Sequence, residues 1–544
     1  MYHGRRVTGS KLSRLSAVAI VLAFVARLPA IVAPFGPDQG VYVTIGWGLS
    51  RGLTLYRDMF ELKPPGIYVT YWAAMKLFGS GAAAEFWLDF VAAAVTVLAV
   101  VGIIRRIASP GFAMFAGAIV AIGTLPAARY AYGGFLERSV TETFTIPLVA
   151  SAVWAATVWL DRDRPVWPVL AGLLLGLAAI YKQSAAIYWP AVILWIAWTA
   201  GAARARRFAL WSFSGLVVAP VTALIWIWST GAFDAAWNAI VRYTVAYIRL
   251  GDQSLFSTLH HFAQEVWRRQ RGFLDRSGTD EVWGLGSLAA VVALVPAIRA
   301  RTSPSGRVAS LGLIWLAAAL TAIVVNGPRF FPTYFVPPQI PLCLLAAWLF
   351  HEVVAIKPRW KLAAGSALLA LTALLVMRSG SIARASQSIG WDWQYISGRI
   401  DRLTYLDRYP PPRPLQAPRA FSAADNQRLA DYVSAHTDPS ERIFVFGMVA
   451  GTYYSSQRLP ANRFLYAYPA VSNMGNYPEF RAETLAADLA RAQPRYIILQ
   501  RTNGDSFSGW RAVDAFNAPV FVPLLERYRI ETEIGDFVLY RRLD

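Results

Sequence analysis

The stretch from Pro37 to Gly79 holds ionisable side chains that could do chemistry, yet it lies between long apolar segments. Asp38 follows the two prolines that end the first apolar run, so we expect its carboxylate at a membrane boundary. A carboxylate there could take a proton from a hydroxyl group, as a general base does. The competing role is that of an N-cap for the helix that follows.

Lys63 precedes a Pro-Pro-Gly sequence in the same stretch. A following proline favours extended backbone, and proline suits the first turn of a helix, so a helix is expected to begin near Pro65. Its aromatic and apolar residues recur at three- and four-residue spacing from Ile67 to Phe78. A cation beside the free N–H groups of a helix start would bind an anion such as phosphate. The alternative is a lysine that reaches lipid phosphates.

These residues must be positioned by elements that cross a membrane. The chain is 56% hydrophobic and 16% charged, which excludes an ordinary soluble protein. Apolar runs long enough to span a bilayer recur from Leu15 to about Arg378. We therefore predict a mainly α polytopic bundle of about eleven spans in residues 1–378. Residues 379–544 are predicted to form a water-soluble α/β domain, with strands in RIFVFG and RYIILQ and a closing hairpin in RIETEIGDFVLYRR.

The net charge of +19 does not indicate nucleic acid, because the basic residues of the first part gather in short loops between apolar runs. This positive-inside pattern predicts a cytoplasmic N-terminus and an extracytoplasmic C-terminal domain in the inner membrane. Arg27, inside the first apolar run, is expected to face the bundle or to reach toward the outer surface. The single cysteine, Cys343, can form no intramolecular disulfide.

The predicted topology places most ionisable residues at one face. For any one of them, a solvated loop charge is the ordinary interpretation. Several stand at span ends, however, where an ionisable group indicates function. Asp58 and Glu61 are expected mainly to shape their loop. The candidates at this face are Asp38, Asp58, Glu61, Lys63, Arg129, Glu137, Arg138, Glu142, Lys182, Arg242 and Arg329.

Five short motifs together resemble the polyprenyl-phosphate-dependent glycosyltransferases of the GT-C fold. They are PDQGVY with Asp38, LYRDMFELKPPGIY with Lys63, SVTETFTIPL with Glu142, LAAIYKQSA with Lys182, and GPRFFPTYFVPPQIP with Arg329 and Tyr334. The tail string IFVFGMVAGTYYSSQRLPANRF also resembles the outer domain of that family. The subgroup contains bacterial relatives of protein O-mannosyltransferases, the aminoarabinose transferase of lipid A, and rhizobial galacturonosyltransferase-like proteins. Gln39 departs from the family's frequent Asp-Glu pair, and Thr333 stands where histidine is frequent.

The resemblance implies transfer of a sugar from a polyprenyl-phosphate carrier to an acceptor hydroxyl of a glycolipid, lipopolysaccharide, polysaccharide or protein, with inversion at the anomeric carbon. Asp38 is then the general base, and Lys63, with Lys182 or Arg329, binds the departing phosphate. The substrate-binding candidates are Glu142, Tyr334, Glu137 and Arg138.

Other classes of protein fit the sequence less well. The chain carries no phosphate-binding P-loop and no HExxH sequence. The string DRDR lies in a short loop and is interpreted as a solvated turn, and His260-His261 alone is weak evidence for a metal. No metal ligand is therefore assigned, although a divalent cation is left open. A multi-span secondary transporter is the alternative function, but no repeated halves are visible. A sensor whose spans only anchor it ranks last.

Overall fold

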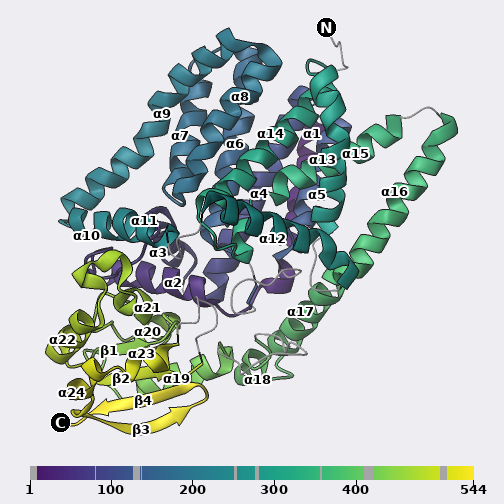
Figure 1. Ribbon diagram of the computed structural model, residues 1–544. Helices are drawn as coiled ribbons and strands as arrows, with labels where there is room; N and C mark the ends of the chain where they lie inside the picture. Colours follow the sequence, from purple (N-terminus) through teal and green to yellow (C-terminus); the bar gives the residue numbers. More distant parts are fainter. Residues whose placement is uncertain are drawn as a thin grey trace.

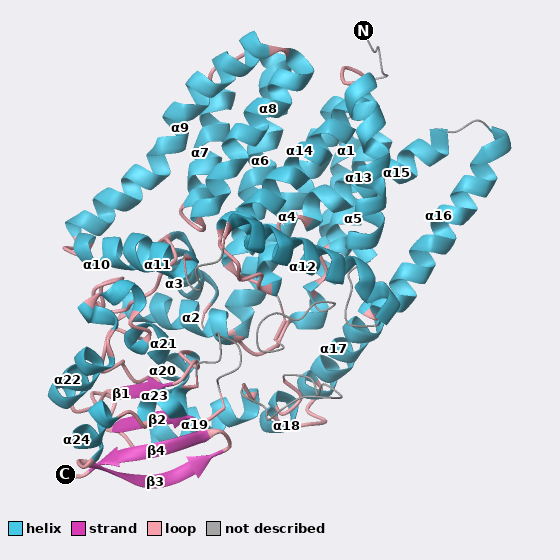
Figure 2. Ribbon diagram, in the orientation of Figure 1, coloured by secondary structure: helices cyan, strands magenta, loops and turns pink. Residues whose placement is uncertain are grey.

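The computed structural model describes residues 9–79, 81–126, 135–136, 138–249, 254–275, 281–355, 358–409, 421–502 and 511–544. A bundle of long helices makes up most of it, and one end of this bundle is covered by a smaller region that contains the strands (Figures 1 and 2). The expected mainly α membrane bundle with a C-terminal α/β region is confirmed.

The helices of the bundle and its connecting loops run through the first three quarters of the chain. They are α1 (Gly9–Val25), α2 (Pro37–Ser50), α3 (Gly66–Phe78), α4 (Ala82–Ile107), α5 (Pro110–Gly123), α6 (Thr141–Arg162), α7 (Val166–Ala179), α8 (Tyr188–Ala200), α9 (Ala202–Ser229), α10 (Phe233–Trp237), the π-helical turn η5 (Asn238–Tyr243), α11 (Thr244–Ile248), α12 (Leu255–Asp275), α13 (Glu281–Arg299), α14 (Pro304–Val325), the 3-10 turn η6 (Pro332–Phe335), α15 (Gln339–Ala355), α16 (Pro358–Ser379) and α17 (Ser381–Ile396).

Among the described residues, seven helical segments are long and apolar enough to cross a membrane, so the chain is a multi-span membrane protein. They are Ala83–Ile107, Thr141–Arg162, Ala202–Ser229, Glu281–Arg299, Pro304–Val325, Pro332–Ala355 and Trp360–Ser379. Three shorter apolar helices accompany them, at Ala17–Ala30, Pro110–Gly123 and Val166–Ala179. The count of about eleven spans stays a prediction.

Packing within the bundle follows the rules of membrane helices. Helices α7 and α9 pack closely along glycines, and a Cβ atom at Gly172 would lie 1.8 Å from the carbonyl oxygen of Ser212. The outer face of α9 is apolar and exposed, with Leu210 at 76% and Trp228 at 72% of full exposure. Such a face suits contact with lipid rather than water.

The C-terminal region holds one four-stranded sheet in the order β1-β2-β4-β3. Strands β1 and β2 are parallel and fully buried, and β4 pairs antiparallel with both β2 and β3. Gly535, at φ +53°, occupies the left-handed region in the tight turn between β3 and β4. All three predicted strand segments are confirmed. The elements are α18 (Arg402–Leu406), α19 (Ala423–Ala435), β1 (Ile443–Phe446), α20 (Gly451–Ser456), α21 (Ala467–Val471), α22 (Ala482–Ala492), β2 (Tyr496–Gln500), α23 (Ala512–Phe516), α24 (Val522–Leu525), β3 (Tyr528–Ile534) and β4 (Phe537–Arg542).

The C-terminal region is hydrogen-bonded to helix α2 and to the loop that follows it. The hydroxyl of Thr44 donates to the carbonyl of Ala450 at 2.9 Å, and the N–H of Phe60 donates to the carbonyl of Arg463 at 2.7 Å. One continuous hydrophobic core joins α2 and α3 to the sheet, whereas the membrane helices share a second core. The loop that carries Lys63 is therefore held between the bundle and the sheet.

Candidate functional site

A cavity of about 110 Å³ lies where the start of α2, its following loop, the start of α6, the η5–α11 segment and the C-terminal region meet. We call it the central cavity. Four of the predicted site residues line it: Asp38, Lys63, Glu142 and Tyr334. These residues come from four segments of the chain, and the predicted topology places three of them, Asp38, Lys63 and Glu142, at one face. The other lining residues are Pro37, Val41, Glu61, Leu62, Tyr243, Tyr247, Phe331, Thr333, Met448, Tyr466 and Tyr468.

Asp38 stands in the first turn of α2. The helix begins at Pro37 with Gly36 as its N-cap, so Asp38 is not the N-cap, and this competing role is excluded. Its carboxylate lies in the first turn, at the positive end of the helix dipole. The hydroxyl of Tyr42, one turn later, donates to Asp38 Oδ2 at 3.4 Å. The carboxylate is half-buried and lines the cavity, where it could meet a substrate hydroxyl.

Gln39 has a structural role at the start of the same helix. Its Oε1 accepts from the N–H of Gly36, and its Nε2 donates to the carbonyl of Arg138 at 2.8 Å. The side chain is buried and does not line the central cavity. An acid at position 39 would lose the donated bonds, so Gln39 ties α2 to the segment before α6 instead of acting as a second acid.

Lys63 is the cation of the cavity. Its Nζ lies 3.7 Å from Glu61 Oε1 and 5.2 Å from the centre of the Tyr42 ring. Burial lowers the pKa of Lys63, but the carboxylates of Glu61, Asp38 and Glu142 outweigh this and raise it above its ordinary value. Lys63 therefore stays protonated at neutral pH. The helix that follows it, α3, begins at Gly66, as the sequence predicted, and the N–H of Gly66 donates to the carbonyl of Ile180 at 2.8 Å.

Glu61 is a site residue that sequence reasoning missed, because we expected it mainly to shape its loop. It is 1% exposed and lines the cavity, and its Oε2 accepts from the hydroxyl of Tyr466 at 3.2 Å. Asp58 does shape the loop, since its Oδ2 accepts from the N–H of Thr54 at 2.8 Å. The two acids differ in burial, which local sequence does not show.

Glu142 and Lys182 form an ion pair beside the cavity. The hydroxyl of Thr141 donates to Glu142 Oε2 at 2.7 Å, and Lys182 Nζ lies 3.6 Å from the centre of the Tyr334 ring. Glu142 and Tyr334 line the central cavity, whereas Lys182 stands behind them in a smaller adjoining cavity. Lys182 thus positions the other two residues.

Arg329, another predicted site residue, does not line the central cavity. The guanidinium of Arg329 lies 4.1 Å from the ring centre of Tyr247, which itself lines the cavity. Arg329 therefore supports the wall from behind. Glu137, Arg129 and part of the segment around them lie outside the described residues.

Arg138 lies in a buried group that we call the anchor cluster: Arg27, Glu85, Asp89 and Arg138. Arg138 is 2.7 Å from Glu85 Oε2 and donates to the carbonyl of Ala33 at 2.7 Å. Arg27 lies 3.1 Å from Asp89, so it faces the bundle, as expected. The two arginines join α1 and the start of α2 to α4 and do not line the central cavity.

Tyrosines make up much of the cavity wall, and sequence reasoning assigned them no role apart from Tyr334. Tyr243 and Tyr247 come from η5 and α11, and Tyr466 and Tyr468 come from the C-terminal region. The signal in the sequence is the string RFLYAYPA, whose two tyrosines stand at the start of α21 and both line the cavity. The C-terminal region thus completes the cavity instead of only covering it.

No group of three or more His, Cys, Asp or Glu side chains suited to a metal ion occurs among the described residues. His260 and His261 both lie on α12, with ring centres 6.1 Å apart.

A membrane bundle whose loops gather carboxylates and a lysine beneath a small α/β region has the architecture of GT-C membrane glycosyltransferases, and the comparisons confirm that resemblance. Residues 62–228 match the model of the dolichyl-phosphate-mannose-protein mannosyltransferase family. The matched segment contains Lys63, Glu142 and Lys182. Comparison of the sequence with curated proteins gives no match.

Two solved structures of similar fold cover almost the whole chain. One is ArnT from Cupriavidus metallidurans bound to undecaprenyl phosphate, with 13% identity, a TM-score of 0.57 and coverage of 99% of each chain. The other is ArnT from the same organism in the apo state, with 16% identity, a TM-score of 0.53 and coverage of 98% of each chain. At this identity the likeness concerns the fold, and it includes the C-terminal region.

Proposed function

We propose that this protein is a membrane glycosyltransferase that moves a sugar from a polyprenyl-phosphate carrier to an acceptor hydroxyl. The observation that carries the proposal is that Asp38 and Lys63 line the same cavity at the end of a membrane bundle. One group can take a proton and the other can bind a phosphate, and these are the two tasks of the reaction. The family match and the fold support the same conclusion.

The proposed reaction is a single displacement at the anomeric carbon. The acceptor oxygen attacks this carbon while its proton passes to Asp38, and the bond between the carbon and the phosphate oxygen breaks on the opposite face. The sugar is therefore transferred with inversion. The electron pair of the broken bond stays on the leaving phosphate, and Lys63 stabilises its growing negative charge.

The other residues hold these two groups in place or bind substrate. Glu61 orients Lys63, and Glu142 and Tyr334 bind sugar or acceptor hydroxyls from the cavity wall. Lys182 and Arg329, behind that wall, add positive potential near the phosphate. In this proposal neither Lys182 nor Arg329 contacts the leaving phosphate directly. Arg138 was a substrate-binding candidate, but its buried pairing with Glu85 favours a structural role.

We further propose that the cavity opens at the outer face of the inner membrane, with a cytoplasmic N-terminus and an extracytoplasmic domain that starts near residue 379. The basic loops of the sequence support this orientation. A carrier lipid would approach from the bilayer with its phosphate at Lys63. One of the two similar ArnT structures has undecaprenyl phosphate bound, which supports a ligand of this class. The acceptor would be a glycolipid, lipopolysaccharide, polysaccharide or protein.

The rival function, secondary transport, finds no support in the family match or in the fold comparisons. The elements that line the central cavity, among them α2 and α11, lie at the end of the bundle next to the C-terminal region (Figure 1). Transporters place their substrate sites near the middle of the bilayer.

The test uses membranes that carry the full chain and a panel of radiolabelled polyprenyl-phosphate sugars. The wild type should consume one of these donors and label a glycolipid, glycan or protein. Asp38→Asn and Lys63→Ala should abolish labelling, whereas the controls Asp234→Asn and Lys76→Ala, both at exposed positions, should retain it. If both cavity variants label at the wild-type rate, the site assignment is wrong. Uptake of a solute into proteoliposomes without donor consumption would favour the transporter.

A further inference from the structure

Tyr42 lies between the two groups that carry the proposed chemistry, although it does not line the central cavity. Its hydroxyl donates to Asp38 Oδ2 at 3.4 Å, and Lys63 Nζ lies over its ring, 5.2 Å from the ring centre. Asp38 and Tyr42 are four positions apart on α2, so both side chains lie on the same face of that helix. A single side chain thus contacts both the proposed base and the cation proposed to bind phosphate.

The hydrogen bond between Tyr42 and Asp38 has a fixed direction. Tyr42 is 0% exposed, and burial together with the negative charges of Asp38 and Glu142 raises the pKa of its hydroxyl well above the ordinary value. The hydroxyl therefore stays protonated and donates, and the carboxylate accepts through Oδ2. It is the hydrogen-bond donor that the described part of the chain provides to this carboxylate. Oδ1 remains available to a substrate hydroxyl.

Packing keeps the ring of Tyr42 in place. Its centre lies 6.1 Å from the ring centre of Tyr68 and 5.7 Å from that of Tyr71, both in α3. Tyr71 is itself held, because its hydroxyl donates to the carbonyl of Ser139 at 2.9 Å. A fully buried ring packed in this way can adopt few other rotamers. Tyr42 can therefore hold the groups that contact it in a defined geometry.

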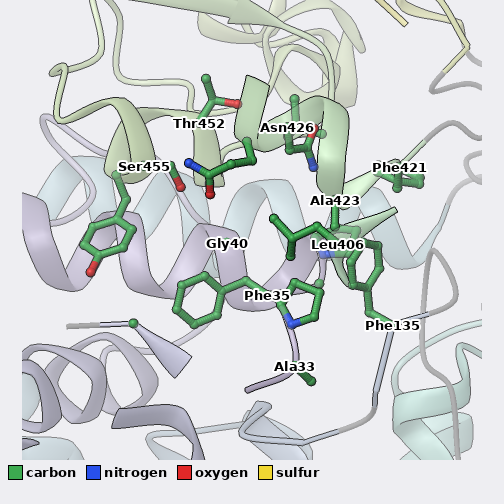
Figure 3. Close-up of a pocket in the computed structure, with 18 of the residues that line it drawn as sticks. Ala33, Phe35, Gly40, Phe135, Leu406, Phe421, Ala423, Asn426, Thr452 and Ser455 are labelled. Carbon is green, nitrogen blue, oxygen red and sulfur yellow. The ribbon is translucent and has the colours of Figure 1, made fainter. Parts of the chain in front are cut away.

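The C-terminal region packs on a different face of α2 and fixes the rotation of this helix. A Cβ atom at Gly40 would lie 3.0 Å from the N atom of Gly451, so the backbones of α2 and α20 approach closely there. The cavity of about 240 Å³ shown in Figure 3 is lined by Gly40 but by neither Asp38 nor Tyr42. Positions 38 and 42 share one side of the helix, and position 40 lies on the other.

We propose that Tyr42 is a positioning residue of the transfer reaction. Its hydroxyl holds the Asp38 carboxylate so that Oδ1 meets the acceptor hydroxyl, and its ring holds Lys63 at the carrier phosphate. The distance between the base and the cation is thereby fixed, as a displacement with the acceptor and the leaving phosphate on opposite faces of the sugar requires. Tyr42 itself touches neither substrate. This inference rests on the proposed function.

The test measures the steady-state kinetics of sugar transfer by the full chain in membranes, with the donor that the wild type consumes. Tyr42→Phe keeps the ring and removes the hydroxyl. It should lower kcat about tenfold, the value of one hydrogen bond to a charged group, and leave the KM for the donor unchanged. Tyr68→Phe is the matched control, because the hydroxyl of Tyr68, in the same group of packed rings, has no hydrogen-bond partner among the described residues. Its kcat and KM should equal those of the wild type.

Tyr42→Leu removes the ring as well. Its KM for the donor should rise about fivefold, the effect of a lost cation–π contact, in addition to the fall in kcat. Undecaprenyl phosphate, the lipid bound in one of the similar structures, provides a second measurement that needs no transfer. It should bind wild type and Tyr42→Phe equally and Tyr42→Leu about fivefold more weakly. If Tyr42→Leu does not fold, Tyr42→Phe decides alone.

The division between kcat and KM separates this role from a structural one, because a variant that only folds less well has fewer active molecules with the wild-type constants. The proposal is overturned if Tyr42→Phe transfers sugar at the wild-type rate, or if Tyr42→Phe and Tyr68→Phe lose activity equally. Weaker binding of undecaprenyl phosphate to Tyr42→Leu, without any sugar transfer by the wild type, would overturn the proposed function and leave the contact with Lys63 in place.

Discussion

Two groups of charged residues lie near the start of α2, and they use the same residue types differently. The anchor cluster pairs Arg27 with Asp89 and Arg138 with Glu85, and Arg138 also serves backbone carbonyls. The cavity cluster comprises Asp38, Glu61, Lys63, Glu142 and Lys182, of which the first four line the central cavity. In the first group the charges face only each other and the backbone, whereas in the second group four of the paired or neighbouring charges also face space that a substrate can enter.

The comparison teaches that a charged residue at bilayer depth indicates either function or architecture, and that its partners decide which. Adjacent positions 38 and 39 show this most directly. Asp38 points into the cavity, whereas Gln39 holds the segment that carries Arg138. A change in the cavity cluster should therefore alter the rate of transfer, and a change in the anchor cluster should alter stability.

The largest effect is expected for Asp38→Asn. Loss of a general base lowers rates by a factor of about 10²–10⁴, and the amide keeps the shape of the side chain. Sugar transfer should fall by about a thousandfold, while the melting temperature in detergent stays within a degree or so of wild type. Rates from membranes with equal amounts of protein provide the measurement, with Asp234→Asn as the exposed control. A stable variant with full activity would remove Asp38 from the mechanism.

Arg138→Ala should show the opposite pattern. The change leaves Glu85 buried without its cation and frees the carbonyl of Ala33, at a cost of about 3–5 kcal/mol. We expect a large loss of folded protein and a lower melting temperature, with the activity of each surviving molecule close to wild type. The double variant Arg138→Met with Glu85→Gln should recover part of the loss, because no unpaired charge remains.

The matched control for this change is Arg207→Ala. Arg207 pairs with Asp163 at 3.1 Å, but both side chains are more than half exposed. An exposed pair contributes about 0–1 kcal/mol, so the melting temperature should hardly change. If Arg138→Ala melts like this control and instead loses activity, Arg138 belongs with the cavity cluster.

Glu61→Gln sharpens the boundary between the two groups, because Glu61 is as buried as an anchor residue but lines the cavity. The change removes the carboxylate that orients Lys63 and that accepts from Tyr466. Transfer should fall about tenfold, the value of one hydrogen bond to a charged group. Kinetics at saturating carrier provide the measurement, with Glu526→Gln at an exposed position as control. A fall in melting temperature at an unchanged rate would class Glu61 as structural.

Much of the fold could be predicted from the sequence, because its signals are local. The apolar runs, the prolines before α3 and the strand segments act over a few residues, and the structure has the helix at Gly66–Phe78 and the hairpin at Tyr528–Ile534 and Phe537–Arg542. Asp38 and Lys63 stand out by residue type and position in one short stretch, and the resemblance added their roles in sugar transfer.

Contacts between distant segments could not be predicted in the same way. Glu61 and Tyr466 are separated by 405 positions, and no local pattern indicates that their side chains meet. Arg138 carries the same charge as Lys63 and stands in a loop of the same predicted face, so sequence alone did not reveal that its charge is used inside the protein. Burial and partner choice depend on tertiary packing, and they separate the anchor cluster from the cavity cluster.

Asp392, in α17, belongs to neither group of charged residues, because it is buried without an ion-pair partner among the described residues. Its replacement is expected to have the smallest effect of the changes considered. Burial raises its pKa to about 7, although the hydroxyl of Tyr405 donates to it at 2.8 Å. The folded protein thus holds a proton that the unfolded chain releases near pH 4. Between these two values the folded state binds more protons, so its stability falls as the pH rises.

Asp392→Asn removes that loss, because an amide stays neutral at every pH. The variant's melting temperature relative to wild type should therefore rise between pH 4.5 and 7.5, by about 2 °C in total. Asp401→Asn is the control: Asp401 is an exposed N-cap that accepts from the N–H of Thr404 at 2.7 Å, and its pKa is lowered by that bonding. Asparagine caps a helix equally well, so the melting temperature of Asp401→Asn relative to wild type should not change between pH 4.5 and 7.5. If the melting temperature of Asp392→Asn relative to wild type does not change with pH, the charge of Asp392 is compensated in the folded protein, as the charges of the anchor cluster are.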